Sequence, residues 1–523
     1  MKNHRNIPYT APPTDHDGSE GLALSFGTGG VRAAEGVGLD HVNDITVGGI
    51  AAALAKAVNA GDFPRRGKGK EILIGYDTRK NSRLYAETFA AVLNEKLLST
   101  CVFPEPVPVP LLSYTLKMGT FRCGVMITAS HNPAVCNGVK IYDGGGVQLL
   151  PGETVIIERI MRKTDPFAVC RMDRKKAEEK GLCRLAGEAP LREYRAAVGA
   201  RRVADSPLKA VVTPLYGSAA ILPREILERC GHSVFGVEGE EIADPSFGGL
   251  AAPNPEDPAV FAAAERVGAK VGADLLLATD GDGDRCGCCA RSGKRFVPLS
   301  GNETAALLVH YLCGHEEIPR EGFIVRSVVS GETAEAVAAD HGLKTVVTPT
   351  GFKYIGDETA RDGEGRFFAG YEESGGFLFR GGAADKDGIA AAALLAEAAA
   401  VYKKEGKTLI DILRELREKY GAERTLTERF VFPGADGEAR RRACEAYFAL
   451  NPFPDGEIDF FADTLIFRFP GRIRTALRPS GTESCLKVYH RATAPDPDRA
   501  GEMLAKTKRR FDDILTVFRG ERI

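Results

Sequence analysis

The chain has 523 residues, of which 44% are hydrophobic and 27% charged, and its formal net charge is −2. This length exceeds what one hydrophobic core supports and predicts roughly three or four domains. The balanced charge gives no global basic field, so we expect neither nucleic acid nor a membrane as a partner. Residues 1–25 are polar and lack an apolar core, which predicts no secretory signal. The twelve cysteines are interpreted as reduced, mostly buried thiols of a cytoplasmic protein.

Apolar runs alternate with helical patterns along the first four fifths of the chain. Three of these runs predict strands, at 71–77, 208–217 and 322–331, and helical patterns follow them from Leu84, Ala219 and Glu332. This order is typical of an α/β fold with mainly parallel sheets. The alanine-rich run 388–402 is too short to span a bilayer and predicts a packed helix.

The C-terminal part follows a different pattern. Alternating runs at 464–470 and 484–492 flank a polar loop, and a helix is expected from about Pro497. This pattern predicts a smaller α+β unit. We therefore expect four domains, with boundaries near residues 200, 300 and 425: residues 1–200, 201–299, 300–425 and 426–523.

The serine loop, TASHNPAVCNGVK at 128–140, directly follows an apolar run. Ligands bind at the carboxyl ends of strands in parallel α/β sheets. A hydroxyl placed there, that of Ser130, can act as a nucleophile or carry a phosphoryl group, and Lys140 can bring a positive charge to the site. The alternative is a plain surface loop, in which Ser and Asn are common.

The metal loop, ATDGDGDRCG at 278–287, follows the apolar run Leu275–Leu277. Asp280, Asp282 and Asp284 alternate with glycines, which places three carboxylates toward one side of the backbone. Hard oxygen ligands of this kind suit Mg²⁺. An EF-hand is excluded, because Arg285 and Arg291 occupy the positions that need Gly and Glu. Three nearby cysteines have no histidine beside them, which argues against zinc.

Two further loops carry groups suited to a sugar phosphate. In the sugar loop, 369–379, the carboxylate of Glu372 and the hydroxyl of Ser374 can bind vicinal sugar hydroxyls, although the same residues are common at a helix start. The phosphate loop, 477–484, is rich in hydrogen-bond donors, although Pro-Ser-Gly also favours a hairpin turn. Its candidate phosphate ligands are Arg478, Ser480, Gly481 and Thr482.

A fifth segment, SFGTGGVR at 25–32, ends in Arg32, and the segment 75–82 contains Asp77 and Arg79. We interpret both as an anion-facing edge. The first segment does not fit the dinucleotide pattern G-x-G-x-x-G, because Arg32 stands where the third glycine belongs. Together, the five segments predict phosphoryl transfer to or from a phosphorylated sugar, with a serine carrier and a metal that neutralises charge.

These loops also resemble a known family. TASHNP with Asn137, Gly138 and Lys140, DGDGDR, GYEESGG and RPSGTES are similar to the four signature loops of the α-D-phosphohexomutases, the superfamily of phosphoglucomutase and phosphomannomutase. All four occur in the family's order, and the resemblance extends from Phe26 to the C-terminal helix. It implies four domains around a central cleft, three of them related α/β domains, each giving one loop.

The resemblance also implies roles for individual residues. Ser130 would be phosphorylated, and Mg²⁺ would be held by that phosphoserine with Asp280, Asp282 and Asp284. The phosphoserine would give its phosphoryl group to a hexose phosphate, and the resulting 1,6-bisphosphate would turn round and return the other group. Glucose 1,6-bisphosphate would prime the enzyme. The sugar would contact Thr350 and Gly351, while charge would be balanced by His131, Arg285 and Lys353.

Within the family, the sequence is closer to the phosphoglucomutase and phosphopentomutase-like branch. Gly376 occupies the place where other branches commonly carry a histidine, and DKDG at 385–388 resembles a segment that supplies a lysine acid/base. This nominates Lys386, with Lys140 as the other proton-transfer candidate; such a lysine needs a lowered pKa. We expect a phosphoglucomutase, monomeric or a small homo-oligomer. A phosphomannomutase, a phosphopentomutase and a catalytically silent phosphosugar-binding relative stay open.

Overall fold

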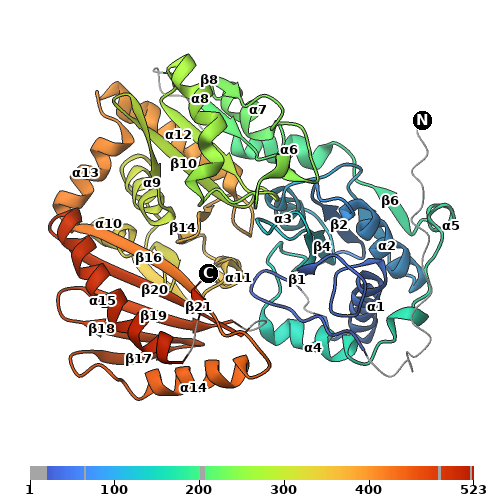
Figure 1. Ribbon diagram of the computed structural model, residues 1–523. Coiled ribbons are helices and arrows are strands. Elements are labelled where there is room, and N and C mark those ends of the chain that lie inside the picture. The colour runs from blue at the N-terminus through green and yellow to red at the C-terminus, as the bar shows by residue number, and fades with distance from the viewer. Residues whose placement is uncertain (1–20, 64–65, 201–206, 481–483, 519–520, 523) are drawn as a thin grey trace.

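The computed structural model describes residues 21–63, 66–200, 207–480, 484–518 and 521–522. Its strands form four sheets that follow one another along the chain (Figure 1). The first three sheets mix parallel and antiparallel pairs and are covered by helices, and the fourth is antiparallel. The prediction of three α/β units and a smaller α+β unit is confirmed. The prediction of mainly parallel sheets is too simple, because each of the first three also carries antiparallel strands.

The first unit is built on a six-stranded sheet in the order β1-β5-β4-β2-β3-β6. Strand β5 runs antiparallel between β1 and β4, and part of it lies within the predicted serine loop. Lys140 therefore lies on a strand rather than in a loop. The elements are β1 (Val31–Ala34), α1 (Asp44–Ala60), β2 (Ile72–Tyr76), α2 (Ser82–Glu95), β3 (Thr100–Val102), α3 (Val109–Met118), β4 (Cys123–Ile127), β5 (Cys136–Asp143), α4 (Pro151–Met161), η1 (Pro166–Ala168), α5 (Arg174–Glu179), β6 (Cys183–Leu185) and α6 (Ala189–Val198).

The second unit has a five-stranded sheet in the order β11-β10-β9-β7-β8. Its central strands β7 and β9 are parallel, and β10 returns antiparallel to β9. The metal loop is the turn between β9 and β10. The elements are β7 (Lys209–Thr213), α7 (Leu222–Arg229), β8 (Ser233–Gly236), η2 (Phe247–Gly249), η3 (Pro258–Phe261), α8 (Ala262–Val271), β9 (Leu275–Thr279), β10 (Cys286–Ser292) and β11 (Arg295–Leu299).

The third unit has a four-stranded sheet in the order β13-β12-β14-β15. The sugar loop joins β14 to β15, which pair antiparallel. The elements are α9 (Gly301–His315), β12 (Phe323–Ser327), α10 (Thr333–Asp340), β13 (Lys344–Thr348), α11 (Phe352–Arg361), β14 (Phe367–Glu372), β15 (Gly376–Phe379), α12 (Gly388–Lys404) and α13 (Leu409–Tyr420).

The fourth unit has a six-stranded sheet in the order β17-β18-β19-β20-β16-β21. Part of the segment predicted as a polar loop forms a strand, β19, paired with β18 and β20. The phosphate loop lies between β19 and β20. The elements are β16 (Ala422–Val431), α14 (Gly437–Ala449), β17 (Glu457–Phe461), β18 (Thr464–Phe469), β19 (Ile473–Pro479), β20 (Cys485–Ala494), α15 (Pro497–Val517) and β21 (Glu521–Arg522).

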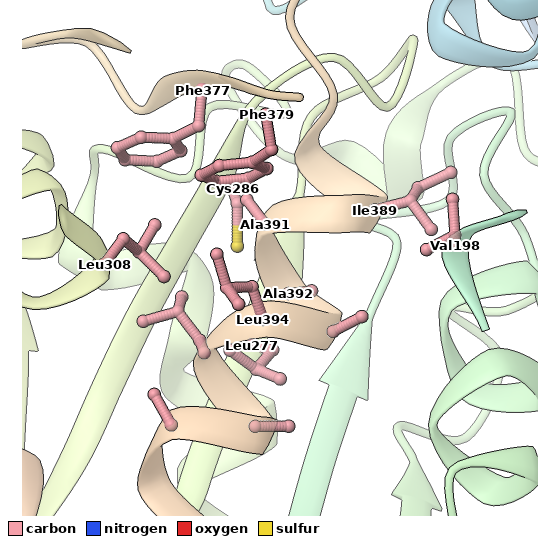
Figure 2. Packing of buried hydrophobic residues seen from close by; sticks show 14 of the residues in the cluster. Val198, Leu277, Cys286, Leu308, Phe377, Phe379, Ile389, Ala391, Ala392 and Leu394 are labelled. Carbon is pink, nitrogen blue, oxygen red and sulfur yellow. The ribbon is translucent and has the colours of Figure 1, made fainter. Parts of the chain in front are cut away.

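Helix α12, the predicted packed helix, joins the cores of the second and third units. Its residues Ala391, Ala392 and Leu394 lie among Leu277 and Cys286 of the second unit and further apolar side chains of the third (Figure 2). Alanines let the neighbouring elements approach closely, and burying one leucine side chain contributes about 1.5–3 kcal/mol. The cores of the second and third units are thus continuous. None of the helices in the described part of the chain is both long and apolar enough to cross a membrane.

Candidate active site

Ser130 lies in the turn that follows β4 and is 1% exposed. Its φ is 53°, a left-handed conformation that costs energy for a residue with a side chain and often marks functional sites. The backbone N–H of Ser130 donates to Thr128 Oγ1 at 2.8 Å, which stabilises the turn. Its hydroxyl donates to Asp280 Oδ2 at 2.8 Å. The turn thus presents the serine to the metal loop, 150 residues away in sequence.

Arg79 holds the serine loop from behind. Its Nη1 donates to the carbonyls of Pro133 and Cys136 at 2.7 and 2.8 Å, and its Nη2 to those of Ser130 and Asn132, both at 2.7 Å. Its Nε donates to Asp77 at 3.1 Å, so all five of its N–H donors are used. The interpretation of Arg79 as an anion-facing residue is wrong, because no donor is left for a ligand. It positions the serine loop instead.

The three aspartates of the metal loop converge as the sequence predicts. Asp280, Asp282 and Asp284 are fully buried, and one ligand oxygen from each lies within 4.8 Å of the others. Asp280 Oδ1 accepts the N–H groups of Asp284 and Arg285 at 2.9 and 3.0 Å, which closes the turn. Burial, with the charges of Asp284 and Asp282, raises the pKa of Asp280 well above its usual range. A divalent cation would relieve this repulsion.

The donor set fits a hard cation. Asp282 Oδ1 and Asp284 Oδ1 are buried and accept no hydrogen bond from the residues that the structure describes. Buried carboxylate oxygens normally have partners, so two orphaned oxygens in one site indicate a missing ligand. With Asp280 Oδ2, which faces Ser130 Oγ, they offer three carboxylate oxygens of the kind that Mg²⁺ prefers.

Two lysines share the remaining oxygens of these aspartates. Lys140 Nζ lies 2.8 Å from Asp282 Oδ2 and 2.9 Å from Asp284 Oδ2, and Lys386 Nζ lies 2.8 Å from Asp284 Oδ2. Burial alone would raise the pKa of Asp284, but the two ammonium groups outweigh it and hold that pKa far below its usual range. Burial lowers the pKa of Lys386, but Asp284 and Asp385 more than offset this and raise it. The lowered pKa expected of a proton-transfer lysine is therefore not found at Lys386.

His131 lies beside the serine, and Arg285 and Arg32 lie near His131. His131 Nδ1 lies 3.2 Å from Ser130 Oγ. Burial, with the charges of Arg285 and Arg32, lowers the pKa of His131 well below its usual value, so the ring is neutral. Arg285 donates to Glu256 at 3.1 Å, and Arg32 Nη1 donates to Asn132 Oδ1 at 3.3 Å. Of these three predicted residues, His131 reaches the hydroxyl itself, while Arg285 and Arg32 contact Glu256 and Asn132.

The predicted sugar contacts also come together. The N–H of Gly351 donates to Glu372 Oε1 at 2.7 Å, which joins the segment after β13 to the sugar loop. Thr350 Oγ1 is buried and accepts or donates no hydrogen bond in the described part of the chain, while Ser374 is half-buried. Burial, with the neighbouring charge of Glu373, raises the pKa of Glu372 to about 7. This carboxyl is thus half-protonated near neutral pH.

Arg478 belongs to the part of the phosphate loop that the structure describes, and it contacts another unit. Its Nη2 donates to Thr28 Oγ1 at 2.9 Å in the first unit, and its Nε to Asp463 at 3.0 Å. Ser480 donates its N–H to the carbonyl of Cys485 across the base of the loop. Lys353 lies nearby, and burial with the charge of Arg478 lowers its pKa to about 8. Gly481 and Thr482, also predicted phosphate ligands, lie outside the described residues.

Comparisons with known proteins agree with this geometry. Models of the phosphoglucomutase/phosphomannomutase α/β/α domains I, II and III match residues 23–167, 191–293 and 300–420. The phosphoglucomutase of Staphylococcus aureus strain MRSA252 is 28% identical over 513 residues, which cover 92% of each chain.

Together the three domain models span most of the sequence in the family's order. The chain belongs to the phosphoglucomutase/phosphomannomutase family. With that family it is a phosphohexomutase, an isomerase. Solved structures share the fold: a family protein from Burkholderia thailandensis (TM-score 0.72, 18% identity, 94% of this chain and 97% of that chain) and the open form of Paramecium parafusin (TM-score 0.71, 16% identity, 95% and 96%).

Gly376 lies close to the side chain of Lys386. A Cβ at position 376 would lie 2.9 Å from Lys386 Cδ and 3.2 Å from the ring of Phe352. Contacts this short are rarely tolerated, so glycine leaves the space that the Lys386 side chain crosses. The position of the Lys386 side chain therefore depends on the small size of residue 376. Sequence reasoning named both but could not show that they touch.

Sequence reasoning missed several residues of this phosphohexomutase site. Thr128 donates to Asp282 at 3.2 Å, Glu256 pairs with Arg285, and Thr28 meets Arg478. Thr28 and Thr128 belong to segments that the sequence already singled out, so their position beside Arg32 and Ser130 was a usable signal. Glu256 lies in a segment without any motif, and only the fold brings it to the site.

Proposed function

We propose that this phosphohexomutase is a Mg²⁺-dependent phosphoglucomutase, which interconverts glucose 1-phosphate and glucose 6-phosphate through a phosphoserine at Ser130. The hydrogen bond from Ser130 Oγ to Asp280 Oδ2, at 2.8 Å, carries this proposal. It joins a hydroxyl to a cluster of three carboxylates that could hold a cation, and this supports phosphoryl transfer from a serine. The S. aureus relatives named phosphoglucomutase support glucose as the sugar.

Asp280, Asp282 and Asp284 would hold the metal together with the phosphorylated Ser130. When bound, Mg²⁺ supplies charge neutralisation for the oxygens of the transferring phosphoryl group. Lys140 and Lys386 keep their contacts to Asp282 and Asp284 on the other side of these carboxylates. Asp282 and Asp284 would thus offer the metal the oxygens that the lysines do not contact.

In the proposed reaction, a hydroxyl of the sugar phosphate attacks the phosphorus on Ser130. The Ser130 Oγ–P bond breaks as the new sugar O–P bond forms, and the proton of the sugar hydroxyl ends on Ser130 Oγ. Lys386 and Lys140 are the proposed carriers of that proton, since both lie on carboxylates beside the serine. The glucose 1,6-bisphosphate so formed turns round and returns its other phosphoryl group to Ser130 by the reverse step.

The sugar end would bind either orientation of the bisphosphate. Glu372 and Ser374 would bind sugar hydroxyls, Thr350 and Gly351 would line the sugar, and Arg478 with the phosphate loop would hold the non-reacting phosphate. Arg32, His131 and Arg285 would surround the reacting phosphate. Glucose 1,6-bisphosphate would act as the activator, because it phosphorylates an enzyme that has lost its phosphoryl group.

The test is a coupled assay on the purified protein with glucose 1-phosphate, Mg²⁺ and a trace of glucose 1,6-bisphosphate. Mannose 1-phosphate and ribose 1-phosphate run in parallel. Fast formation of glucose 6-phosphate that EDTA abolishes is expected. Preference for mannose or ribose phosphate would keep the mechanism and overturn the sugar. No turnover, with no phosphoryl group found on the primed protein by intact mass, would point to a silent phosphosugar-binding relative.

A further inference from the structure

The segment that carries Lys386 belongs to the third unit but is held by the first. Lys117 Nζ donates to the carbonyls of Gly382 and Ala383 at 2.7 and 3.3 Å. Ser113 Oγ accepts the N–H of Ala384 at 3.0 Å. Lys117 and Ser113 both lie on α3 of the first unit. The backbone leading to Lys386 is therefore fixed to the unit that also contains Ser130.

Tyr142, also in the first unit, contacts Asp385, the residue directly before Lys386. Its hydroxyl donates to Asp385 Oδ2 at 3.1 Å, while Asp385 Oδ1 accepts the N–H of Lys386 at 2.8 Å. Tyr142 is fully buried and lies two residues after Lys140 on β5, so both side chains leave the same face of that strand. One strand thus places Lys140 against Asp284 and Tyr142 against the residue before Lys386.

Tyr194 holds the other side of the same segment. Its hydroxyl donates to Asp387 Oδ1 at 2.8 Å, and Asp387 caps α12 by accepting the N–H of Ala390 at 2.8 Å. Tyr194 is fully buried on α6, which follows β6, the last strand of the first sheet. Burial and the nearby aspartates raise the pKa of both tyrosines well above the usual value, so both hydroxyls keep the proton that they donate.

We propose that Tyr142 and Tyr194 are positioning residues, which hold Asp385 and Asp387 so that Lys386 Nζ stays against Asp284, 2.8 Å away. This inference rests on the proposed function, in which Lys386 carries a proton. Its consequence is that a proton-transfer group from the third unit is fixed relative to Ser130 of the first. Movement of the third unit would not change the distance between them.

The contacts around Asp385 explain why the hydroxyl of Tyr142 matters. Lys386 Nζ already lies 3.7 Å from Asp385 Oδ1, so Asp385 and Asp284 compete for the same ammonium group. Tyr142 satisfies the other oxygen of Asp385. Without that donor, the buried carboxylate would need a new partner, and the Lys386 ammonium group is near. Lys386 would then move away from Asp284 and from the reacting atoms.

The experiment compares three substitutions that each remove one hydroxyl. Tyr142→Phe and Tyr194→Phe remove the two proposed contacts. Tyr114→Phe is the matched control: Tyr114 is also buried, its ring lies 5.6 Å from that of Tyr194, and its hydroxyl makes no hydrogen bond in the described part of the chain. We expect Tyr142→Phe to lower kcat about tenfold to a hundredfold, as for a misplaced catalytic group. Tyr194→Phe should have a smaller effect, and both variants should keep KM.

A double-mutant cycle separates positioning from general stabilisation. If Tyr142 acts through Lys386, Tyr142→Phe should cause no further loss of kcat in a Lys386→Ala background. If the role of Tyr142 is purely structural, Tyr142→Phe should lower kcat by the same factor in both backgrounds. That result would overturn the inference. So would an unchanged kcat in both phenylalanine variants of an active enzyme. Tyr194→Phe provides the same cycle if Tyr142→Phe does not fold. A wild-type protein without any turnover would overturn the proposed function, and this inference with it.

Discussion

The two ends of the site are built differently. At the end that contains Ser130 and the three aspartates, every one of these side chains is at most 1% exposed, and contacts from the first and third units surround them. At the sugar end, Thr350 Oγ1 has no partner in the described part of the chain, Ser374 is half-buried, and Arg478 reaches Thr28 of another unit. The groups of the first end are fixed by contacts within the protein, while at the second end the hydroxyl of Thr350 keeps hydrogen-bonding capacity that no described residue uses.

This difference matches what each end must do. Phosphoryl transfer gains most from groups that are fixed in advance, because a fixed charge needs no reorganisation as the reaction proceeds. In the proposed mechanism, the sugar end would accept two orientations of one bisphosphate, so its donors and acceptors would have to be free until the ligand arrives. We therefore expect substitutions at the first end to lower kcat and those at the second to raise KM.

The largest effect is expected at Ser130. Ser130→Ala removes the oxygen that would carry the phosphoryl group, so turnover should fall by roughly 10⁴-fold or more. Circular dichroism and Tm should stay close to wild type, because the change removes one atom. Intact mass after priming with glucose 1,6-bisphosphate should show a phosphoryl group on the wild type and none on the variant. Near-normal activity in this variant would refute Ser130 as the carrier.

The next effect is expected at the cation site. Asp282→Asn removes a carboxylate charge but keeps the shape, and it should weaken Mg²⁺ binding by about a hundredfold or more, since even outer contacts of a metal cost 10–100-fold. Titration calorimetry on the unphosphorylated protein measures this without turnover. Asp274→Asn is the control, since Asp274 precedes β9 at its opposite end and pairs with Lys403. Equal Mg²⁺ affinity in both variants would show that the aspartates do not hold the metal.

The third prediction concerns the support of the serine loop. Arg79→Lys keeps the charge but offers three donors instead of five, so at least two buried or partly buried acceptors lose their partner, at up to about 1–3 kcal/mol each. The Tm should fall by several degrees, and kcat should drop about tenfold to a hundredfold as Ser130 loses its position. Arg83→Lys is the control, one turn of backbone away, where the side chain is exposed and pairs with Glu87. If Arg79→Lys behaves like Arg83→Lys, the loop does not depend on these contacts.

The same contrast explains what the sequence could predict. The metal loop was predictable because its three aspartates are close in sequence, and their alternation alone brings the carboxylates together. The strand β19 was missed, since its residues Arg474, Thr475 and Arg478 make it polar, although its partners β18 and β20 were recognised. The role of Arg79 was also missed, because a guanidinium that binds carbonyls and one that binds a phosphate have the same sequence signature. Only the fold shows which acceptors are present.

At the sugar end, Arg478→Ala should raise KM for the sugar phosphate about tenfold and change kcat less. The expected loss is that of one charge-assisted contact, which contributes roughly 1.5–3 kcal/mol. Arg478 is proposed to hold the phosphate that does not react, so it binds both ground state and transition state. Arg468→Ala is the control on neighbouring β18, where the side chain is half exposed and pairs with Asp459. A loss confined to kcat would instead assign Arg478 to the end of the site that contains Ser130.

The smallest effect is a pH dependence at Glu372, whose pKa in the folded protein is raised from 4.5 to about 7 by burial and by Glu373. Between these two values the folded protein holds a proton that the unfolded chain releases. The free energy of unfolding should therefore fall as pH rises from about 4.5 to 7. In the proposed site, the carboxylate form would accept hydrogen bonds from sugar hydroxyls, so kcat/KM should rise over pH values around 7.

Glu372→Gln separates these two consequences, since glutamine keeps the size of the side chain and does not titrate. Its Tm should lack the decline that the wild type shows across that pH range, and its kcat/KM should be a few-fold lower than wild type above pH 7 and flatter below it. Denaturant unfolding and initial rates at matched pH values measure both. A wild-type profile that Glu372→Gln leaves unchanged would assign the titration to another group. The sugar end would then be as fixed in its protonation as the end that contains Ser130.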